Sequence, residues 1–419
     1  MSCPLSGVNI PSTPLRGAAY LPGRNTMAVQ RVLLVHLTSN GDCLMATTVA
    51  RQIKNDYPGC HLTWAISLQC KQVIENNPFV DEIWSVEYAP YDHPHDDVWR
   101  RTKAEALRRQ KSGQFDLVLF TQIFPENFNN FDGTTRSSIF RSYPGKITVP
   151  VDPVLHLLPS EVERVAKFAS DHALGNYKNV ILFECSPASH QSPMTQEKAL
   201  RISAQIAEKR HDTAIIISSH KSFQSPTPAV MDASALSFRE NAELSKYCTL
   251  LLGCSSGITW LLTSNWANKL PTIQFLGRDP CWHSFASVKY DHRFWGLATD
   301  HILETDLHSD GDVVALVLKY LDQGNFEGFQ DAAFMPSIEQ IYNLHQVTRD
   351  RLDARRVLEN FIERNPQIPV NRAAYYYRLL HSEMRGELAA VLPSTLASTK
   401  RTARLLCRLI GEISSRRSD

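Results

Sequence analysis

The chain has 419 residues, of which 43% are hydrophobic, and its formal net charge is +1. This length is enough for two domains, and the composition is that of an ordinary globular protein. The near-neutral charge indicates no nucleic-acid partner.

Nine cysteines are scattered along the chain, and no two of them form a C-x-x-C pair or a metal-ligand spacing. This pattern is typical of reduced thiols in a cytoplasmic protein. The first 27 residues are rich in proline, glycine and serine and lack a continuous apolar segment. They are predicted to form a disordered leader, and Met27 is a second candidate for the native start.

The most informative stretch is residues 31–58. An apolar run at 32–35 predicts a buried parallel strand, and a polar loop at 38–42 then leads into a helix with apolar residues at helical spacing. In α/β proteins such a helix start binds anions or holds catalytic groups. Asp42 lies at this junction, where it could cap the helix or act as a general base on a hydroxyl group. The loop residues before it are Ser39, Asn40 and Gly41.

Further strands and helices alternate through the first half of the chain. Strands are predicted at 61–66, 80–86 and 115–120, and helices at 71–77 and 98–111. This alternation predicts a parallel, doubly wound sheet. Prolines near residues 150–159 mark a boundary, so a first Rossmann-like lobe is expected over residues 28–158.

The same alternation of strands and helices begins again beyond the prolines and predicts a second Rossmann-like lobe over residues 159–330. The two lobes are expected to face each other across a cleft. The predicted strands are 180–183, 214–217, 249–252 and 272–276, and the predicted helices are 161–172, 196–209, a helix within 236–247, and 258–266.

Residues 331–419 are predicted to form a helical extension. Its last helix has Leu406, Leu409, Ile410 and Ile413 on one face and arginines on another. Such a face packs against the body or against a second copy of the chain; contact with an anionic membrane surface is the alternative. The protein is therefore expected in the cytoplasm, with the inner face of the membrane as a possible peripheral location.

Two polar loops follow buried strands of the second half and offer hydrogen-bond donors that suit a diphosphate. They also suit simple helix capping or an ordinary polar loop. Neither matches the dinucleotide-binding or P-loop motif. The candidate binding residues are Glu184, Ser186, Ser189, Gln191 and Ser192 in one loop and Ser255, Ser256 and Gly257 in the other.

Several of these segments resemble glycosyltransferase family 9, the ADP-heptose:lipopolysaccharide heptosyltransferases, which have the two-lobed GT-B fold. The resemblance covers residues 31–277 and rests on RVLLVHLTSNGDCLMATTVARQIKNDYPGCHLTW, NNPFVDEIW, FDLVLF, the Ser-Ser-Gly loop and LPTIQFLG. It implies that Asp42 deprotonates the acceptor and that the second lobe holds the nucleotide and the diphosphate.

The sequence departs from the family in the two donor-side loops. The family pattern Asp-(Ser/Thr)-Gly-x-x-His is replaced by Ser255 to Trp260, which lacks both the acid and the histidine. The second loop has Gln191 or Ser192 where the family has a lysine. These changes put ADP-heptose in doubt as the donor.

The function expected from these observations is an inverting glycosyltransferase. It would move a heptose-like or other sugar from a nucleotide-sugar donor to a hydroxyl of a glycan, a lipid-linked acceptor or a protein, with Asp42 as the base. No Asp-x-Asp motif lies in the three loops, so metal independence and no other cofactor are predicted. The alternatives are a catalytically silent GT-B scaffold that binds a sugar nucleotide or a glycan and, less favoured, a nucleotide-sugar epimerase.

Overall fold

The computed structural model describes residues 29–88, 95–185, 187, 192–277, 287–332, 334, 336–343 and 351–391. The expected leader and the apolar face of the last predicted helix lie outside these residues. The candidate site residues Ser186, Ser189 and Gln191 also lie outside them.

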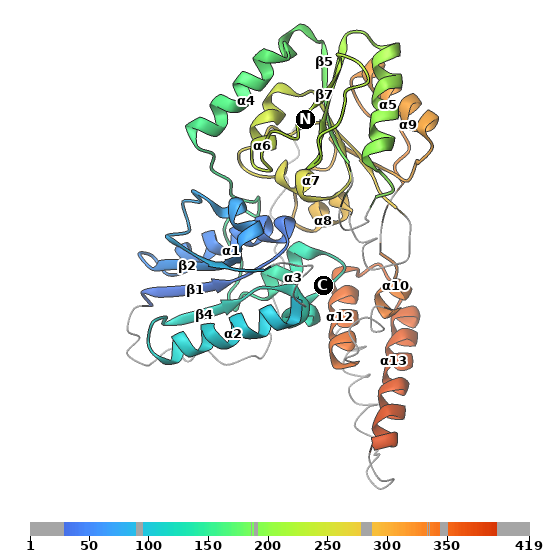
Figure 1. Ribbon diagram of the computed structural model, residues 1–419. Helices are drawn as coiled ribbons and strands as arrows, with labels where there is room; N and C mark the ends of the chain where they lie inside the picture. Colours follow the sequence, from blue (N-terminus) through green and yellow to red (C-terminus); the bar gives the residue numbers. More distant parts are fainter. Residues whose placement is uncertain are drawn as a thin grey trace, which may run out of the picture.

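The first lobe is built on a parallel four-stranded sheet in the order β3-β2-β1-β4. In Figure 1 it is the lower, blue part of the molecule, with α1 on one side of the sheet and α2 on the other. Its strands are β1 (Arg31–Val35), β2 (His61–Ser67), β3 (Glu82–Val86) and β4 (Leu117–Phe120), and its α-helices are α1 (Asn40–Asp56), α2 (His95–Lys111) and α3 (Thr135–Arg141). The helix expected at 71–77 is a 3-10 helix at Leu68–Ile74.

The central strands β1 and β2 are buried on both faces, because alternate side chains pack into different hydrophobic clusters. On β1, Val32 and Leu34 join the cluster that contains the apolar side of α1. Leu33 and Val35 join a second cluster with Trp99 of α2. A continuous apolar strand is the sequence pattern that such two-sided burial requires.

The second lobe contains a parallel six-stranded sheet in the order β10-β9-β8-β5-β6-β7. In sequence order this is the 3-2-1-4-5-6 arrangement of a Rossmann fold. Its strands are β5 (Asn179–Glu184), β6 (Thr213–Ser218), β7 (Val230–Asp232), β8 (Leu250–Gly253), β9 (Thr272–Phe275) and β10 (Ile302–Thr305), and its α-helices are α4 (Pro159–Asp171), α5 (Gln196–Lys209), α6 (Glu240–Leu244), α7 (Gly257–Leu261), α8 (Val288–Phe294) and α9 (Asp310–Gln323).

The predicted two-lobed α/β architecture is confirmed, whereas some element boundaries were wrong. Strands β7 and β10 were not predicted. Helix α7 ends at Leu261 instead of continuing to 266. The chain leaves the helix because Asn265 bonds to the segment between the lobes: its N–H donates to the Pro153 carbonyl at 3.0 Å, and its Oδ1 accepts from the Leu155 N–H at 2.8 Å.

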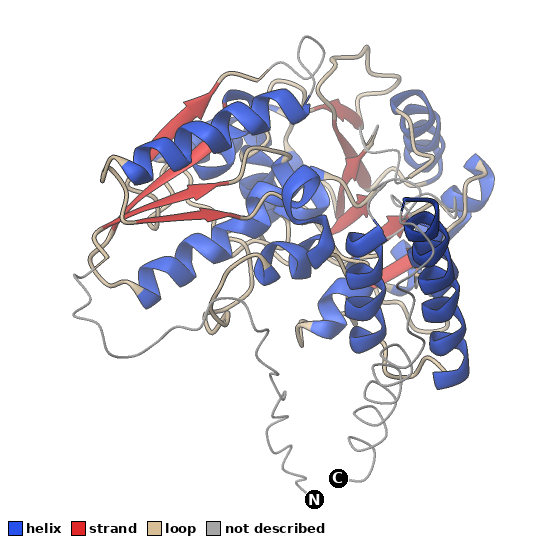
Figure 2. Ribbon diagram, turned by 90° about the horizontal axis from the view of Figure 1, so that it is seen from below, coloured by secondary structure: helices blue, strands red, loops and turns tan. Residues whose placement is uncertain are grey.

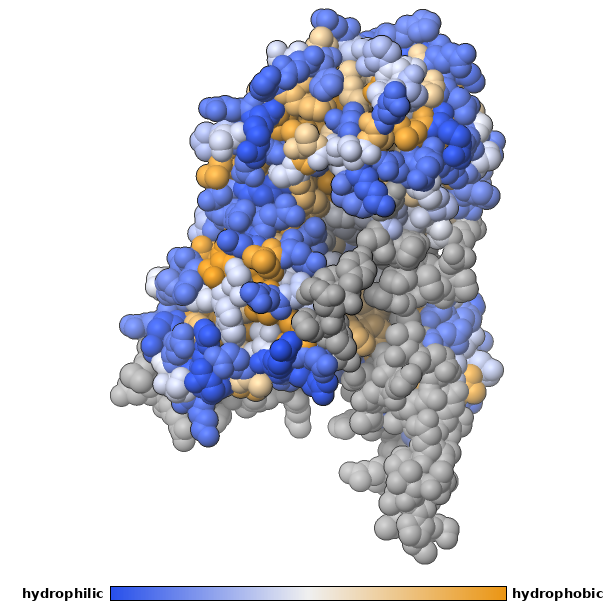
Figure 3. Space-filling model, viewed as in Figure 1, coloured by the Kyte–Doolittle hydropathy of each residue, from blue (hydrophilic) through white to orange (hydrophobic). Residues whose placement is uncertain are grey.

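The predicted helical extension contains α10 (Ile338–Asn343), α12 (Arg351–Arg364) and α13 (Val370–Val391). Figure 1 shows these helices beside the first lobe and below the second, and Figure 2 shows the molecule from the side on which they lie. None of the helices in the described part of the chain has the length and hydrophobicity of a membrane span. On the face seen in Figure 3, hydrophilic residues dominate, and hydrophobic residues gather in small groups on both lobes.

Candidate functional site

The first half of the site lies where the strand order of the first sheet reverses, between β1 and β4. Ligands of open α/β sheets bind outside the carboxyl ends of the strands at such a point. Gln122, just after β4, ties the two strand ends together. Its Oε1 accepts from the Leu37 N–H at 2.8 Å and from the Thr38 N–H at 3.2 Å, and its Nε2 donates to the Thr38 carbonyl at 2.8 Å. The loop that leads to Asp42 is therefore fixed from the neighbouring strand.

Asp42 lies in the first turn of α1, at the third helical position after the N-cap residue Ser39. The Ser39 N–H donates to Asp42 Oδ2 at 3.4 Å, which is a long hydrogen bond. Asp42 is partly exposed. The surrounding protein removes water from the carboxyl group, and this desolvation raises its pKa to about 7, although the Ser39 hydrogen bond lowers it. A carboxyl group with this pKa can accept a proton near neutral pH.

His36 lies directly after β1 and is fully buried. Burial lowers the pKa of its imidazole to about 3, so the ring is neutral at neutral pH. Its Nδ1 lies 3.0 Å from Thr121 Oγ1, and its backbone carbonyl accepts from Trp64 Nε1 at 3.0 Å. These contacts hold the base of the loop in place from β4 and β2.

The second half of the site lies at the corresponding point of the second sheet, between β5 and β8. Here the Glu184 carboxylate, at the end of β5, fills the start of α7. It accepts from the Cys254 N–H at 2.7 Å and from the Thr259 N–H at 3.1 Å. The hydroxyl groups of Ser256 and Thr259 also donate to it. A carboxylate of the protein thus occupies the donor groups that a phosphate would use at a helix start.

The remaining described residues of the two donor-side loops pack closely around Glu184. The Ser192 Oγ accepts from the Met194 N–H at 3.3 Å, and the Cys254 thiol donates to the Glu184 carbonyl at 3.2 Å. Ser255 is buried and has a φ of 55°, in the left-handed region. A Cβ at Gly257 would lie 2.8 Å from Phe238 Cε2, so a larger residue at this position would have to displace the phenyl ring. The loops form one preorganised unit.

The two halves of the site meet at Gly41 and Trp260. A Cβ on Gly41 would lie 3.5 Å from Trp260 Cδ1, which places the indole ring of α7 against the start of α1. The structure therefore brings together the residues that the sequence singled out in the first and third loops. Glu184 connects the third loop to the second.

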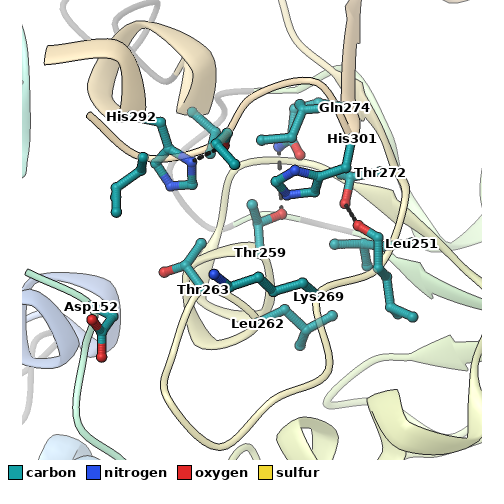
Figure 4. A pocket seen from close by; sticks show the side chains of 15 residues that line it. Asp152, Leu251, Thr259, Leu262, Thr263, Lys269, Thr272, Gln274, His292 and His301 are labelled. Carbon is teal, nitrogen blue, oxygen red and sulfur yellow. Dashed lines mark hydrogen bonds between the residues drawn. The ribbon is translucent and has the colours of Figure 1, made fainter. Parts of the chain in front are cut away.

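A cavity of about 90 Å³ lies behind α7, between this helix, α8 and the sheet. Figure 4 shows Thr259, Thr263, Lys269 and His292 around it. His292 Nδ1 lies 3.2 Å from the Ala298 carbonyl, and burial lowers the pKa of the ring to about 4. Thr259 lines this cavity and also bonds Glu184, so the cavity adjoins the donor-side loops without containing the predicted site residues.

No cluster of three or more histidine, cysteine, aspartate or glutamate side chains suited to a metal ion occurs in the described ranges. Metal independence stays a prediction.

Gln122 and Thr259 were not predicted as site residues. Gln122 could have been found from its place directly after a predicted strand, once the strand order was known. The role of Thr259 depends on its contact with Glu184, and these two residues are 75 positions apart in the sequence.

No family model matches the sequence, and none of the curated proteins matches it. The structure is similar to that of glycosyl transferase family 9 from Veillonella parvula DSM 2008, at 13% identity and a TM-score of 0.46 over 78% of this chain and 99% of that chain. It is similar to E. coli ADP-heptose lps heptosyltransferase II at 12% identity and a TM-score of 0.47, over 70% of this chain and 99% of that chain.

A third similar structure is the iron-containing dodecameric glycosyltransferase TibC from enterotoxigenic E. coli H10407. It is 12% identical, with a TM-score of 0.38 over 85% of this chain and 77% of that chain. Identities this low do not establish a function for this chain, so its function has to be inferred from its own residues. The chain is similar in structure to glycosyltransferases, including members of family 9.

Proposed function

We propose that this protein is an inverting glycosyltransferase in which Asp42 is the general base. The observation that carries the proposal is the position of Asp42: a partly exposed carboxyl group with a pKa of about 7, at the strand-order reversal of one lobe and next to the contact with the other. The resemblance to glycosyltransferase family 9 in the same segment supports it.

In this mechanism a hydroxyl group of a glycan, a lipid-linked acceptor or a protein binds beside Asp42. Its oxygen attacks the anomeric carbon of the donor sugar while Asp42 takes the proton. The bond between that carbon and the diphosphate oxygen breaks on the opposite face, and the nucleoside diphosphate leaves with the electron pair. A base with a pKa near the working pH is half ionised there and still accepts a proton effectively.

The nucleotide sugar is proposed to bind to the second-lobe loops, with Ser192, Ser255, Ser256 and Gly257 as the described candidates. Glu184 uses two backbone N–H groups and two hydroxyl groups of this region. Its negative charge opposes a phosphate in the same place. The diphosphate is therefore expected beside this cluster, held by donors other than those that Glu184 occupies.

The first experiment identifies the donor by thermal shift with UDP-, GDP-, ADP-, CMP- and dTDP-sugars, since a bound donor stabilises the folded state. ADP-heptose belongs in the panel because one structural neighbour is an ADP-heptose heptosyltransferase. Sugar transfer from the stabilising donor is then measured for wild type and Asp42→Asn. We expect a loss of roughly 10²- to 10⁴-fold in turnover. EDTA is expected to leave the wild-type rate unchanged.

Asp312→Asn is a matched control. Asp312 is also the third residue after a serine N-cap, in α9, where its Oδ2 accepts from the Ser309 hydroxyl at 2.5 Å. It is exposed and lies outside the site. We expect this variant to keep wild-type turnover. Transfer by Asp42→Asn at the wild-type rate would overturn the assignment of the base.

Glu184 also favours a second candidate function, a catalytically silent scaffold that binds a sugar nucleotide or a glycan. A carboxylate that fills the expected diphosphate donors would weaken catalysis of donor cleavage. The discriminating measurement is hydrolysis of the stabilising donor without acceptor. Slow hydrolysis that depends on Asp42 supports the transferase, and binding without any turnover supports the scaffold.

A further inference from the structure

Arg364, near the end of α12 in the C-terminal extension, contacts both lobes at once. Its Nη1 lies 3.1 Å from Asp132 Oδ2 and donates to Thr134 Oγ1 at 2.9 Å and to Ser137 Oγ at 2.8 Å, all in the first lobe. Its Nη2 donates to the Tyr290 carbonyl of α8, in the second lobe, at 2.8 Å. The side chains of Arg364 and Asp132 are 2% and 0% exposed, so this ion pair is buried.

The surroundings of Arg364 reinforce the connection between the lobes. Its guanidinium lies 4.3 Å from the ring centres of Tyr290 and Phe294, both on α8. Burial would raise the pKa of Asp132, but the charges of Arg364 and Arg141 hold it below its usual value. Removing the guanidinium would leave a buried carboxylate with fewer partners.

The extension also packs directly on the first lobe. Asn360 Nδ2 donates to the Asn129 carbonyl at 2.8 Å and to the Phe131 carbonyl at 3.3 Å. A Cβ on Gly133 would lie 3.5 Å from the Phe361 ring. One hydrophobic cluster contains Phe128 and Phe131 of the first lobe, Tyr290 of the second, and residues of α10, α12 and α13.

Two more buried arginines join the lobes without the extension. Arg136 of α3 donates through Nε to Asp291 Oδ2 of α8 at 2.8 Å, and these side chains are 0% and 2% exposed.

Arg239 of the second lobe is also buried, and it forms an ion pair with Glu161 in which Nε lies 2.8 Å from Oε1. Its Nη1 donates to the Gln72 carbonyl of the first lobe at 3.0 Å.

We propose that the C-terminal extension is a strap that holds the two lobes in one relative orientation, with Arg364 as its central contact. Opening the lobes would separate Arg364 from Asp132 or from Tyr290 and would expose the shared hydrophobic cluster. Breaking a buried ion pair is strongly unfavourable because an uncompensated charge remains. The candidate site between the lobes would therefore be preorganised, with both lobes in their final relative orientation before a ligand binds.

The test measures the distance between the lobes by double electron–electron resonance on the full chain. Spin labels are attached at Ser112→Cys, at the end of α2, and at Glu208→Cys, on α5; both positions are exposed. The six cysteines in the described ranges are buried, and the other three, Cys3, Cys281 and Cys407, are replaced by serine. Wild type is expected to give one narrow distance distribution.

Arg364→Met, which keeps a long side chain without the charge, is expected to broaden the distribution and to add longer distances. Arg372→Met is the matched control, since Arg372 is an exposed arginine of the same extension that pairs with Glu339 within it. This control should give the wild-type distribution. Asn360→Ala, a milder change at the same contact, should give a smaller broadening if Arg364→Met does not fold.

Two results would overturn the proposal. One is a wild-type distribution as broad as that of the Arg364 variant. The other is a narrow, unchanged distribution in folded Arg364→Met or, where that variant does not fold, in Asn360→Ala.

Discussion

The two lobes place a helix start at the same point of their sheets, but they use it differently. In the first lobe, α1 presents Asp42, a partly exposed acid whose hydrogen bond to Ser39 is 3.4 Å long. In the second lobe, the start of α7 is filled by Glu184, which is 1% exposed and accepts four hydrogen bonds.

The comparison indicates that a carboxylate at a helix start can have different roles, which depend on its hydrogen bonds and its exposure. At α7 the carboxylate satisfies backbone N–H groups that would otherwise lack partners, which is a structural task. At α1 the carboxyl group is held by one long bond, and burial raises its pKa to about 7, which suits proton transfer. The following predictions test whether the two starts differ as described.

Glu184→Leu should have the largest effect on stability. It leaves the buried Cys254 and Thr259 N–H groups without their acceptor, and each such group costs about 1–3 kcal/mol, so a loss of about 2–6 kcal/mol is expected. Glu184→Gln keeps one acceptor oxygen and should lose less. The free energy of unfolding in urea measures both. A loss of under about 1 kcal/mol for leucine would mean that α7 does not depend on this side chain.

Gly257→Ala should have a smaller effect. The new Cβ would lie 2.8 Å from Phe238 Cε2, so the phenyl ring must move. Overpacking of this kind costs about 1–3 kcal/mol. The urea midpoint of this variant relative to wild type is the measurement, and an unchanged midpoint would show that the ring adjusts freely.

Gly41→Ala should have the smallest effect. Its Cβ would lie 3.5 Å from Trp260 Cδ1, an ordinary contact distance, and alanine is the better helix former. We expect the free energy of unfolding to change by less than about 1 kcal/mol. A larger loss would show that α1 and α7 are packed as tightly here as α7 is against Phe238.

More of the fold than of the candidate site could be predicted from the sequence. Apolar strands such as 32–35 and 180–183 alternate with amphipathic helices, and this local pattern determines two parallel sheets. The short strand Val230–Asp232 was missed because three residues give no readable pattern. Polar residues after buried strands were predicted to gather at one sheet edge, and the role of these loops as a binding site stays a prediction.

The contacts within the site could not be predicted, because they join residues far apart in the sequence. Glu184 was expected to contact a ligand, and the structure shows it bound to the start of α7. Asp42 was weighed as an N-cap, and the structure places Ser39 in that position. Arg364 lies in a segment for which only helices were predicted, and its partners in both lobes follow from tertiary packing alone.

The pH dependence of kcat/KM for sugar transfer tests the central claim most directly. In the proposed mechanism the ionised form of Asp42 is the active base, and its pKa is about 7, so kcat/KM of wild type should rise as pH increases and level off above that value. Asp42→Asn should be slow and should lose this rise, whereas Asp312→Asn should keep it. A wild-type profile that is flat through pH 7, or an Asp42→Asn variant with the wild-type profile, would contradict the assignment of Asp42 as the base.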